Sequence, residues 1–514
     1  MMRMSLFFEK KDCMRKMTKK ILWGMFFLVV GLALSVAINT LRQGSRQLQV
    51  PLIPVLAIDE NASAQRLAVG LRAQTISSQE PGAFATAAFT QLHAHLQSAF
   101  PRVHAALQPE TVGQASLLFR WPGSDAQAKP ILLMAHQDVV PIAPQTEHLW
   151  QHPPFAGEIA GGFIWGRGAW DDKANLFAMM EAVESLLASG FTPRQTIYLA
   201  FGHDEEIGGS GAREIAALLQ QRGVKLEFVL DEGLLITEGI LAGLDPSAAL
   251  IGVAEKGYTT AALSLDTAGG HSSLPPPKTA IGMMSVALAQ LENRPFPAEI
   301  KGVSRAMFDT IAPEMKGLNR ILLSNLWLFG PLVQSQLEKS TSTNAMLRTT
   351  TALTTVHAGN KDNVLPGHID ATVNFRTLPG ETEASMLAHV RDRIANEQIK
   401  VTLAPGGSFP SKVSSTESAA YYKLNKTIRQ VFANTIVAPG LMLGATDSRH
   451  FEGISEHIFK FSPVRAGEND LPRFHGTNER IAIKNYAEMI RFYHQLVINH
   501  QDTKQAQSFK GEAK

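Results

Sequence analysis

Short apolar runs alternate with longer stretches of helical period over residues 60–235. The apolar runs, typical of buried strands, cover 117–119, 131–135, 196–201 and 228–230, and helices are expected over 62–73, 83–97, 173–188 and 211–221. Strands that alternate with helices predict an α/β fold in which a mostly parallel sheet carries helices on both faces, a three-layer α/β/α arrangement. In such sheets, ligands gather at the carboxyl ends of the strands.

The pattern changes after residue 253 and returns after residue 404. Strands are expected at 259–266, 350–356, 369–377 and 400–403, with a helix over 383–397 and a leucine-rich helical stretch over 313–337. We therefore predict an α+β domain over 254–403, inserted between the two parts of the first domain, 61–253 and 404–500. Helices are expected in the second part at 421–432 and 485–499, before a polar tail over 501–514.

An uncharged, mostly apolar run covers residues 21–38, close to the shortest length that spans a bilayer as a helix. Residues 1–20 hold seven Lys and Arg against two acids, which predicts a basic cytoplasmic tail and places the large domain on the non-cytoplasmic side. Residues 39–60 are expected to form a tether. A signal peptide cleaved near Ala37 is the alternative, but the run is longer than a usual signal core, which favours a transmembrane anchor.

Composition narrows the choice of function. The chain has 514 residues, of which 45% are hydrophobic and 18% charged, as in a globular protein of about two domains. After residue 20 the chain is mildly acidic, which gives no electrostatic basis for binding nucleic acid. The single cysteine, Cys13, precedes the apolar run, so the large domain has no disulfide or thiolate, and any metal must be held by oxygen and nitrogen ligands.

Histidine and acidic residues follow three of the apolar runs. His136 and Asp138 follow 131–135, three consecutive acids follow 196–201, and Asp231 and Glu232 follow 228–230. Adjacent carboxylates repel one another, so a fold keeps them at a strand end when a cation holds them there. Histidine with several carboxylates suits a pair of zinc-like ions, and the sequence therefore predicts a metallohydrolase.

Seven motifs, each weak alone, occur together in order. They are AHQDVVP at 135–141, WGRGAWDDK at 165–173, GHDEE at 202–206, DEG at 231–233, GHSS at 270–273, NFR at 374–376 and FHG at 474–476. From about residue 60 to 500 the chain resembles the co-catalytic zinc peptidases and aminoacylases, which include glutamate carboxypeptidase-like and N-fatty-acyl-amino-acid hydrolase-like members. It is most similar to their carboxypeptidase S-like branch.

The resemblance implies a metal site with two Zn²⁺ ions, for which cobalt or manganese could substitute. Asp171 would bridge the ions, with His136 and Asp231 on one and Glu206 and His475 on the other. The family also has a cis peptide after the bridging aspartate, here Asp171-Asp172.

Catalytic roles follow from the same resemblance. Glu205 would act as the general base, taking a proton from the water that attacks the amide carbonyl and returning it to the leaving amine. Asp138 would orient His136 as a second carboxylate behind the ligand. His271 would stabilise the oxyanion, often across a dimer interface.

The inserted domain is implied to be a ferredoxin-like lid, which would also carry a homodimer interface. Arg376 would grip the substrate carboxylate as a fork, although a plain surface role remains open. Asn363 and Gly444 would contact the substrate from the lid and from a glycine-rich loop.

Together these features predict a zinc-dependent carboxypeptidase or dipeptidase that cleaves a peptide or N-acyl amide bond next to a free carboxylate. An N-acyl amino acid hydrolase or synthase on the same site is an alternative. A catalytically inactive binding module is a further one, which the complete set of ligands and the presence of Glu205 disfavour. A serine hydrolase built on Ser210 would leave the metal-type residues unexplained.

Overall fold

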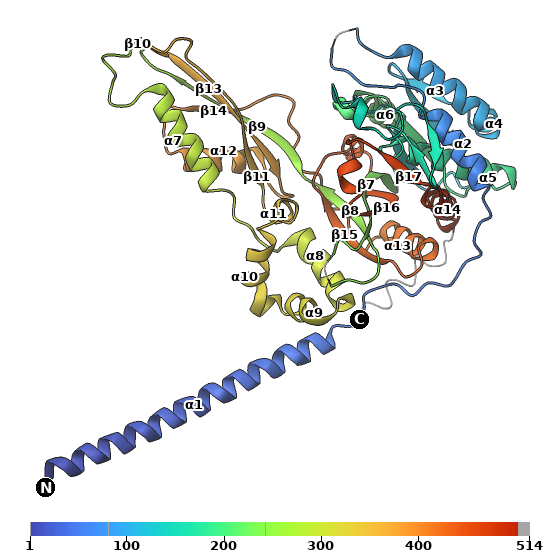
Figure 1. The fold of residues 1–514 in the computed structure, drawn as a ribbon. Helices are drawn as coiled ribbons and strands as arrows, with labels where there is room; N and C mark the ends of the chain where they lie inside the picture. The colour runs from blue at the N-terminus through green and yellow to red at the C-terminus, as the bar shows by residue number, and fades with distance from the viewer. Residues whose placement is uncertain (1, 81, 242, 502–514) are drawn as a thin grey trace.

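The computed structural model describes residues 2–80, 82–241 and 243–501. Figure 1 shows a large lobe, a narrow lid that extends away from it, and a straight helix, α1 (Met2–Arg42), that projects from the base of both. The polar tail expected over 501–514 lies, apart from Gln501, outside the described residues.

The large lobe is built around an eight-stranded sheet in the order β1-β2-β6-β3-β7-β16-β8-β15. Its strands are β1 (Glu110–Val112), β2 (Ser116–Trp121), β3 (Ile131–His136), β6 (Ile197–Gly202), β7 (Phe228–Glu238), β8 (Ala248–Glu255), β15 (Ile436–Met442) and β16 (Ile458–Gly467). Neighbours are parallel at β6–β3, β3–β7, β7–β16 and β8–β15, and antiparallel at β1–β2, β2–β6 and β16–β8. The sheet is therefore mixed, with four parallel and three antiparallel pairs of neighbours, because strand direction depends on long connections and not on the local pattern.

Helices cover both faces of this sheet, as the three-layer prediction requires. They are α2 (Glu60–Gly70), α3 (Thr86–Ala99), α4 (Pro101–Leu107), α5 (Lys173–Ala188), α6 (Ser210–Gln221), α13 (Ala419–Val431) and α14 (Ile483–Asn499). Every residue of β3 is buried. Leu133 packs in the core with α5 and α14, whereas Leu132 and Met134 pack in the core with α6. A small sheet of β4 (Glu158–Ala160), β5 (Phe163–Trp165) and β17 (Arg480–Ala482) completes the lobe.

The lid contains an antiparallel sheet in the order β11-β13-β9-β14. Its elements are β9 (Gly257–Asp266), β11 (Thr350–Ala358), β13 (His368–Thr377), β14 (Lys400–Leu403), α7 (Ala280–Asn293) and α12 (Glu383–Ile394). Side chains alternate along β9 and β13, and the buried set packs against α7 and α12 in a core of its own. β10 (Gly270–His271) pairs with β12 (Val364–Leu365) at the end of the lid farthest from the large lobe (Figure 1). Only Lys256 separates β8 of the large lobe from β9 of the lid.

The leucine-rich stretch over 313–337 contains two short helices, α9 (Gly317–Ser324) and α10 (Leu326–Leu337). The helix α8 (Gly302–Ile311) precedes this stretch and α11 (Thr341–Leu347) follows it. Although these residues lie between lid strands in the sequence, Met307 and Phe308 of α8 share a core with Ile436 and Ala438 of β15. This helical group therefore packs on the outer edge of the large sheet.

Residues 43–59 form neither helix nor strand, yet one of them is fixed on the sheet. The buried Gln47 side chain accepts a hydrogen bond from the backbone N of Val437 (2.7 Å) and donates one to the backbone O of the same residue (3.1 Å). Arg429 donates to the same amide oxygen (3.1 Å). The Gln47 amide thus occupies both backbone groups of one residue of β15, the outermost strand.

Candidate metal centre

Histidine and carboxylate side chains meet at the ends of β3 and β6 and at the irregular part of β7. His136 is the last residue of β3, and Glu205 and Glu206 lie in the 3₁₀ turn Glu205–Ile207 that follows β6. Because β3 pairs with both β6 and β7, its end lies next to the acids that these strands carry. The peptide between Asp171 and Asp172, just before α5, is cis, as the resemblance implied.

Asp171 lies between two imidazole rings. Its Oδ1 is 2.9 Å from His136 Nε2, and its Oδ2 is 2.8 Å from His475 Nε2. Glu206 Oε1 lies 3.3 Å from the same nitrogen of His475, and Glu232 Oε1 lies 3.5 Å from Nε2 of His136. Each oxygen of one carboxylate thus faces a separate set of nitrogen and oxygen donors.

These residues fit a metal site by their chemistry and by an unpaired atom. Ligand atoms lie within 4.8 Å of one another in three groups: His136 with Asp171 and Glu206, His136 with Glu205 and Glu232, and Asp171 with Asp172 and Glu232. Glu206 Oε1 is buried and accepts no hydrogen bond from the described residues, although His475 Nε2, which contacts Asp171, lies 3.3 Å away. A buried carboxylate oxygen without a donor is costly, and a cation would remove that cost.

Crowding of buried charge perturbs this region. Burial raises the pKa of Glu205 well above its usual range, and the neighbouring Asp447 raises it further. Burial and the nearby Asp171 do the same to the pKa of Glu232. Burial also opposes ionisation of Asp171, but hydrogen bonds from His136 and His475 outweigh it and lower the pKa of this carboxyl. The site therefore gathers carboxyl groups whose ionised forms a bound cation would stabilise.

Asp138 connects the histidine to the turn that carries the acids. Its backbone O lies 3.0 Å from His136 Nδ1, and its carboxylate Oδ1 lies 3.2 Å from the same atom. The two carboxylate oxygens also accept hydrogen bonds from the backbone N of Glu205 (3.1 Å) and Glu206 (3.2 Å). One completely buried side chain thus fixes the imidazole plane and the start of the acidic turn together.

A buried ion pair between Arg167 and Glu479, which no sequence motif indicated, supports the segments that carry Asp171 and His475. Arg167 Nη1 donates to Glu479 Oε2 (2.5 Å), and Arg167 Nη2 donates to the backbone O of His475 (3.0 Å). Glu479 Oε1 accepts from the backbone N of Trp170 (2.8 Å) and of Asp171 (3.1 Å). The pair therefore joins the segment of Asp171 to that of His475. Glu479, four residues after His475, gave no local signal beyond its charge.

Asp231, the expected ligand, and its neighbour Glu232 make different contacts in the structure. Asp231 is buried, accepts from the backbone N of Ser448 (2.8 Å) and of Glu232 (3.0 Å), and belongs to none of the three groups. Glu232, to which no role was assigned, belongs to two of them. The register of β7 with β16 shifts between Asp231 and Leu234, an irregularity that lets consecutive side chains reach the same side.

The substrate-contact candidates are spread over the lid and a loop. His271 is exposed on β10, with Nδ1 2.8 Å from Ser273 Oγ, and the Asn363 backbone O accepts from Ser272 N (3.1 Å) at the same tip. Figure 1 places β10 at the opposite end of the lid from the large sheet, so one chain does not bring His271 to the metal cluster. Arg376 lies near the end of β13 at the joint with the large lobe, 4.8 Å above the ring of Tyr258.

Gly444 lies in the loop that follows β15. Two residues later, the backbone N of Thr446 donates to Glu255 Oε2 (3.2 Å), and the backbone N of Ser448 reaches Asp231. This loop therefore lies beside the metal cluster. It also carries Asp447, which is 3% exposed and whose two carboxylate oxygens have no hydrogen-bond partner among the described residues.

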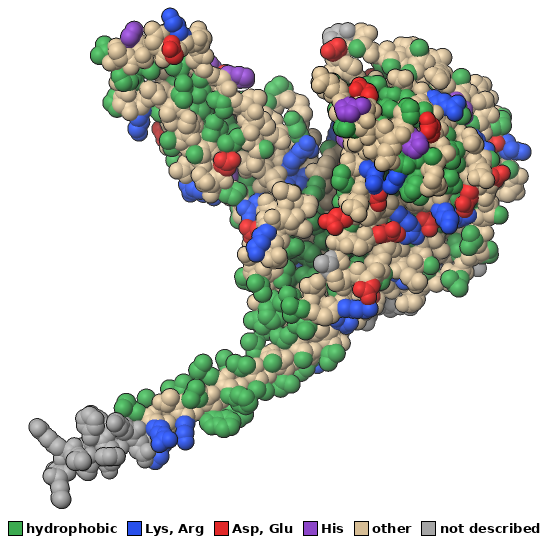
Figure 2. All heavy atoms as spheres, viewed as in Figure 1, with side chains coloured by type: hydrophobic (Ala, Val, Ile, Leu, Met, Phe, Trp, Pro, Cys, Tyr) green, Lys and Arg blue, Asp and Glu red, His purple; other side chains and the backbone are tan. Residues whose placement is uncertain are grey.

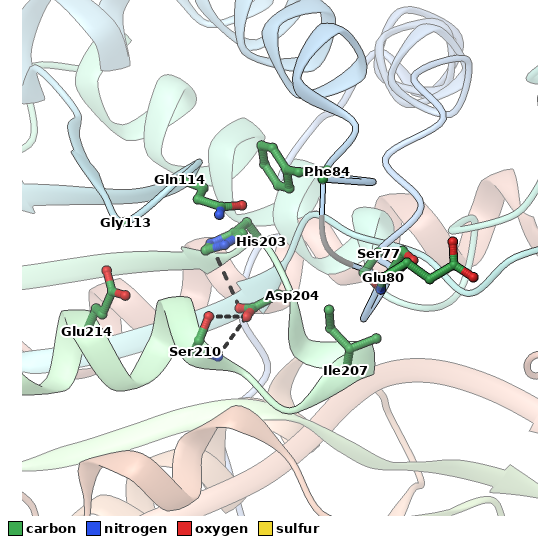
Figure 3. A pocket seen from close by; sticks show the side chains of 12 residues that line it. Ser77, Glu80, Phe84, Gly113, Gln114, His203, Asp204, Ile207, Ser210 and Glu214 are labelled. Atoms are coloured by element: carbon green, nitrogen blue, oxygen red, sulfur yellow. Dashed lines mark hydrogen bonds and ion pairs between the residues drawn. The ribbon is translucent and has the colours of Figure 1, made fainter.

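A polar cavity of about 340 Å³ lies beside the acidic turn, with Asp204 and Ile207 in its lining (Figure 3). His203, Asp204, Ser210 and Glu214 line it, with Phe84 across the opening. The ring Nδ1 of His203 lies 2.7 Å from Ser116 Oγ, and Asp204 Oδ2 accepts from the backbone N of Ser210 (2.8 Å) at the start of α6. These contacts indicate a structural role for His203. A serine nucleophile needs a histidine as its base, whereas the Ser210 hydroxyl donates a hydrogen bond to Asp204.

Comparisons with known proteins agree with this geometry. Residues 132–499 match Peptidase family M20/M25/M40. The chain is 40% identical over 92% of its length to a probable carboxypeptidase S-like protein of Dictyostelium discoideum, of which it covers 92%. It is 39% identical over 92% of its length to an N-fatty-acyl-amino acid synthase/hydrolase of Danio rerio, of which it covers 93%.

Solved structures share the fold. An M20 family metallo-carboxypeptidase from Sulfolobus solfataricus superimposes with a TM-score of 0.59 at 19% identity, over 86% of this chain and 99% of the other. A dinuclear metal-binding M20 peptidase of Bacillus subtilis gives a TM-score of 0.53 at 13% identity, over 86% of this chain and 99% of the other. The family match, the relatives and the cluster of metal-type ligands agree, and the chain belongs to the metal-dependent M20 peptidase family of hydrolases.

Proposed function

We propose that the protein binds two divalent ions, zinc in the first place, and hydrolyses a peptide or N-acyl amide bond next to a free carboxylate. The position of Asp171 carries this proposal: one of its carboxylate oxygens faces His136 and the other faces His475. A carboxylate between two histidines could be shared by two ions, which in such sites lie about 3.5–4 Å apart. His136 and His475 would bind separate ions, Glu206 would join His475, and Asp231 or Glu232 would join His136.

The chain's own residues supply the proton chemistry. The bound ions would supply a polarised water and a polarised amide carbonyl. Glu205 is partly buried and lies within reach of His136 and Glu232 but outside the Asp171–His475 contact, so its carboxylate can take the proton of the attacking water and deliver it to the leaving nitrogen.

The substrate is either a small peptide or an N-acyl amino acid, since the relatives include both a carboxypeptidase S-like protein and an N-fatty-acyl-amino acid synthase/hydrolase. Arg376 would hold the free carboxylate at the joint between lobe and lid, and Gly444 would approach it from the loop beside the cluster. Screening dipeptides against N-acyl amino acids, in the hydrolytic and condensing directions, separates the two candidates.

We propose that residues 254–403 both cover the active site as a lid and mediate dimerisation. His271 and Asn363 lie at its far tip, so we propose that they complete the site of a partner chain in a homodimer. We further propose that residues 21–38 anchor the protein in a membrane with residues 1–20 in the cytoplasm. Among the described residues one helix, Met14–Arg42, is long and apolar enough to cross a bilayer, and export with cleavage near Ala37 is the alternative.

Metal analysis tests the central proposal. The purified full-length protein is expected to contain two ions per chain, to lose activity when a chelator removes them, and to recover it when zinc is restored. Full activity in metal-free protein would overturn the proposal.

A further inference from the structure

Helices α9 and α10 expose large apolar side chains at the base of the large lobe. Trp327 is 59% exposed, Leu332 61% and Leu318 66%. Residues 321–337 contain no charged side chain. Exposed apolar groups gathered on neighbouring helices are unusual on a surface that faces water only.

Hydrogen bonds fix this surface to the end of α1. Asn39 Nδ2 donates to the backbone O of Ser324 (2.7 Å) and to Asn325 Oδ1 (3.0 Å). Asn325 is fully buried, and its Nδ2 donates to Thr40 Oγ1 (2.8 Å). Gln43 Nε2 donates to the same Ser324 carbonyl (2.9 Å). The direction in which α1 leaves the body is therefore set by polar contacts with the junction of α9 and α10.

An apolar groove continues from α1 onto these helices. It is about 620 Å³ and is lined by Val29, Leu32, Val36, Ile321, Leu328 and Phe329, among others. Figure 2 shows the hydrophobic side chains of α1 running without a break onto the base of the body. Val29 and Leu32 belong to the uncharged run of α1, so a bilayer that surrounds this run also reaches the groove.

We propose that α9 and α10 rest in the non-cytoplasmic leaflet of the membrane that α1 crosses, and that lipid acyl chains fill the groove between them. Trp327, whose Nε1 lies 3.2 Å from Asn325 Oδ1, has the place of an interfacial tryptophan, with its ring toward lipid and its N–H toward polar groups. A protein partner fits less well, because it would have to enter the bilayer to cover Val29 and Leu32. The body is thereby held at one orientation by two membrane contacts.

The proposal rests on the proposed anchoring by α1, and its test measures the two separately. In full-length protein with Cys13→Ser, a single cysteine is introduced at Leu332, at Leu28 on α1 (73% exposed) or at Leu274 in the lid (84% exposed), and each is labelled with an environment-sensitive fluorophore. The variants are reconstituted in phosphatidylcholine vesicles with and without brominated acyl chains. Brominated lipid is expected to quench the labels at positions 28 and 332 but not at 274.

Quenching at 28 with none at 332 would overturn the contact of α9 and α10 while leaving the anchor intact. Absence of quenching at both positions would overturn the anchor and, with it, this proposal. A label-free version compares quenching of native tryptophan fluorescence in the Trp23→Phe protein with that in Trp23→Phe/Trp327→Phe. Loss of the quenched component in the double variant is expected, and an unchanged signal would contradict the proposal.

Discussion

The metal cluster and the tip of the lid are built in opposite ways. At the cluster, segments from residues 136 to 475 converge on side chains that contact one another within a single chain, with His136 and Asp171 buried and His475 at the exposed edge. At the tip, His271 is exposed on a two-residue strand and its ring contacts the nearby Ser273. The fold of one chain completes the first arrangement, whereas the second presents its residues outward.

The difference reflects what each site must do. A metal site needs ligands held to within a few tenths of an ångström, which a packed sheet with buried supporting groups such as Asp138 and Glu479 provides. A group that acts on substrate must let the substrate enter and leave, so it can belong to a separate element that approaches from outside. The comparison therefore predicts distinct kinetic effects for changes in the two regions.

The largest effect is expected at the cluster. Glu205→Gln keeps the size of the side chain but removes the base, so kcat should fall by about 10²–10⁴-fold. Its metal content and unfolding temperature should match those of the unchanged protein, as measured by elemental analysis and calorimetry.

His475→Ala is the matched control in the same cluster. It removes a proposed ligand, so both activity and the metal on that side should be lost. If Glu205→Gln also lost metal, or remained active, the assignment of base and ligand would be wrong.

A second large effect is expected at the lid tip. His271→Ala should lower kcat by about 10²–10³-fold with little change in KM, because stabilisation of an oxyanion acts only in the transition state. A variant with unchanged kcat would mean that the exposed tip takes no part in catalysis.

Mixing two inactive variants tests whether His271 acts on the site of a partner chain. If His271 acts on a partner's site, heterodimers of His271→Ala and Glu205→Gln chains should recover part of the activity, because one of their two sites has both residues. No recovery after confirmed subunit exchange would assign each site to a single chain.

A smaller effect is expected at Arg376, which lies between the two regions. A charge-assisted hydrogen bond contributes about 1.5–3 kcal/mol, so Arg376→Ala should raise KM for free-acid substrates by about 10–100-fold. Amidated substrates, which lack the carboxylate, are the control and should be affected little. An equal loss on both substrates would indicate a structural role beside Tyr258.

The smallest effect concerns Lys256, the single residue between β8 and β9. Burial, with the nearby Arg376, lowers its pKa from 10.5 to about 7, while its Nζ donates to the backbone O of Ala345 (2.8 Å) and Arg348 (2.9 Å). Between these values the unfolded chain binds the proton and the folded chain does not, so this residue makes stability rise with pH from about 7 to 10. Urea unfolding of Lys256→Met over this range should show a weaker rise, and an identical slope would exclude this titration.

Much of the large lobe could be predicted because its central strands are buried on both faces and therefore read as plain apolar runs. The prediction for 131–135 corresponds to β3, and that for 173–188 coincides with α5. β16 could not be predicted, because Lys460, Ser462 and Arg465 interrupt its pattern. Lys460 is tolerated in the core because its Nζ lies 3.6 Å from Glu255 Oε2, a pairing that only the tertiary structure shows.

The candidate site was predictable to a similar extent. Residues directly after apolar runs, such as His136 and Glu206, could be selected because strand ends meet at one edge of a sheet. Glu479 could not, since its role depends on Arg167, which lies 312 residues earlier. For His271, the family resemblance implied a role across a dimer interface, but the direction in which the lid extends could not be predicted from the order of the lid strands.

The Gln47 contact has a consequence for aggregation. An outermost strand offers unpaired backbone groups to the strands of other molecules, and these contacts can lead to uncontrolled association. On β15 the Gln47 amide occupies both backbone groups of Val437, and α8 packs against the same strand, so the large sheet is closed to a neighbour at this edge. In the lid, β11 is also outermost, yet its second half is exposed. Of these two edge strands, β11 is therefore the one that stays open to a strand of another molecule.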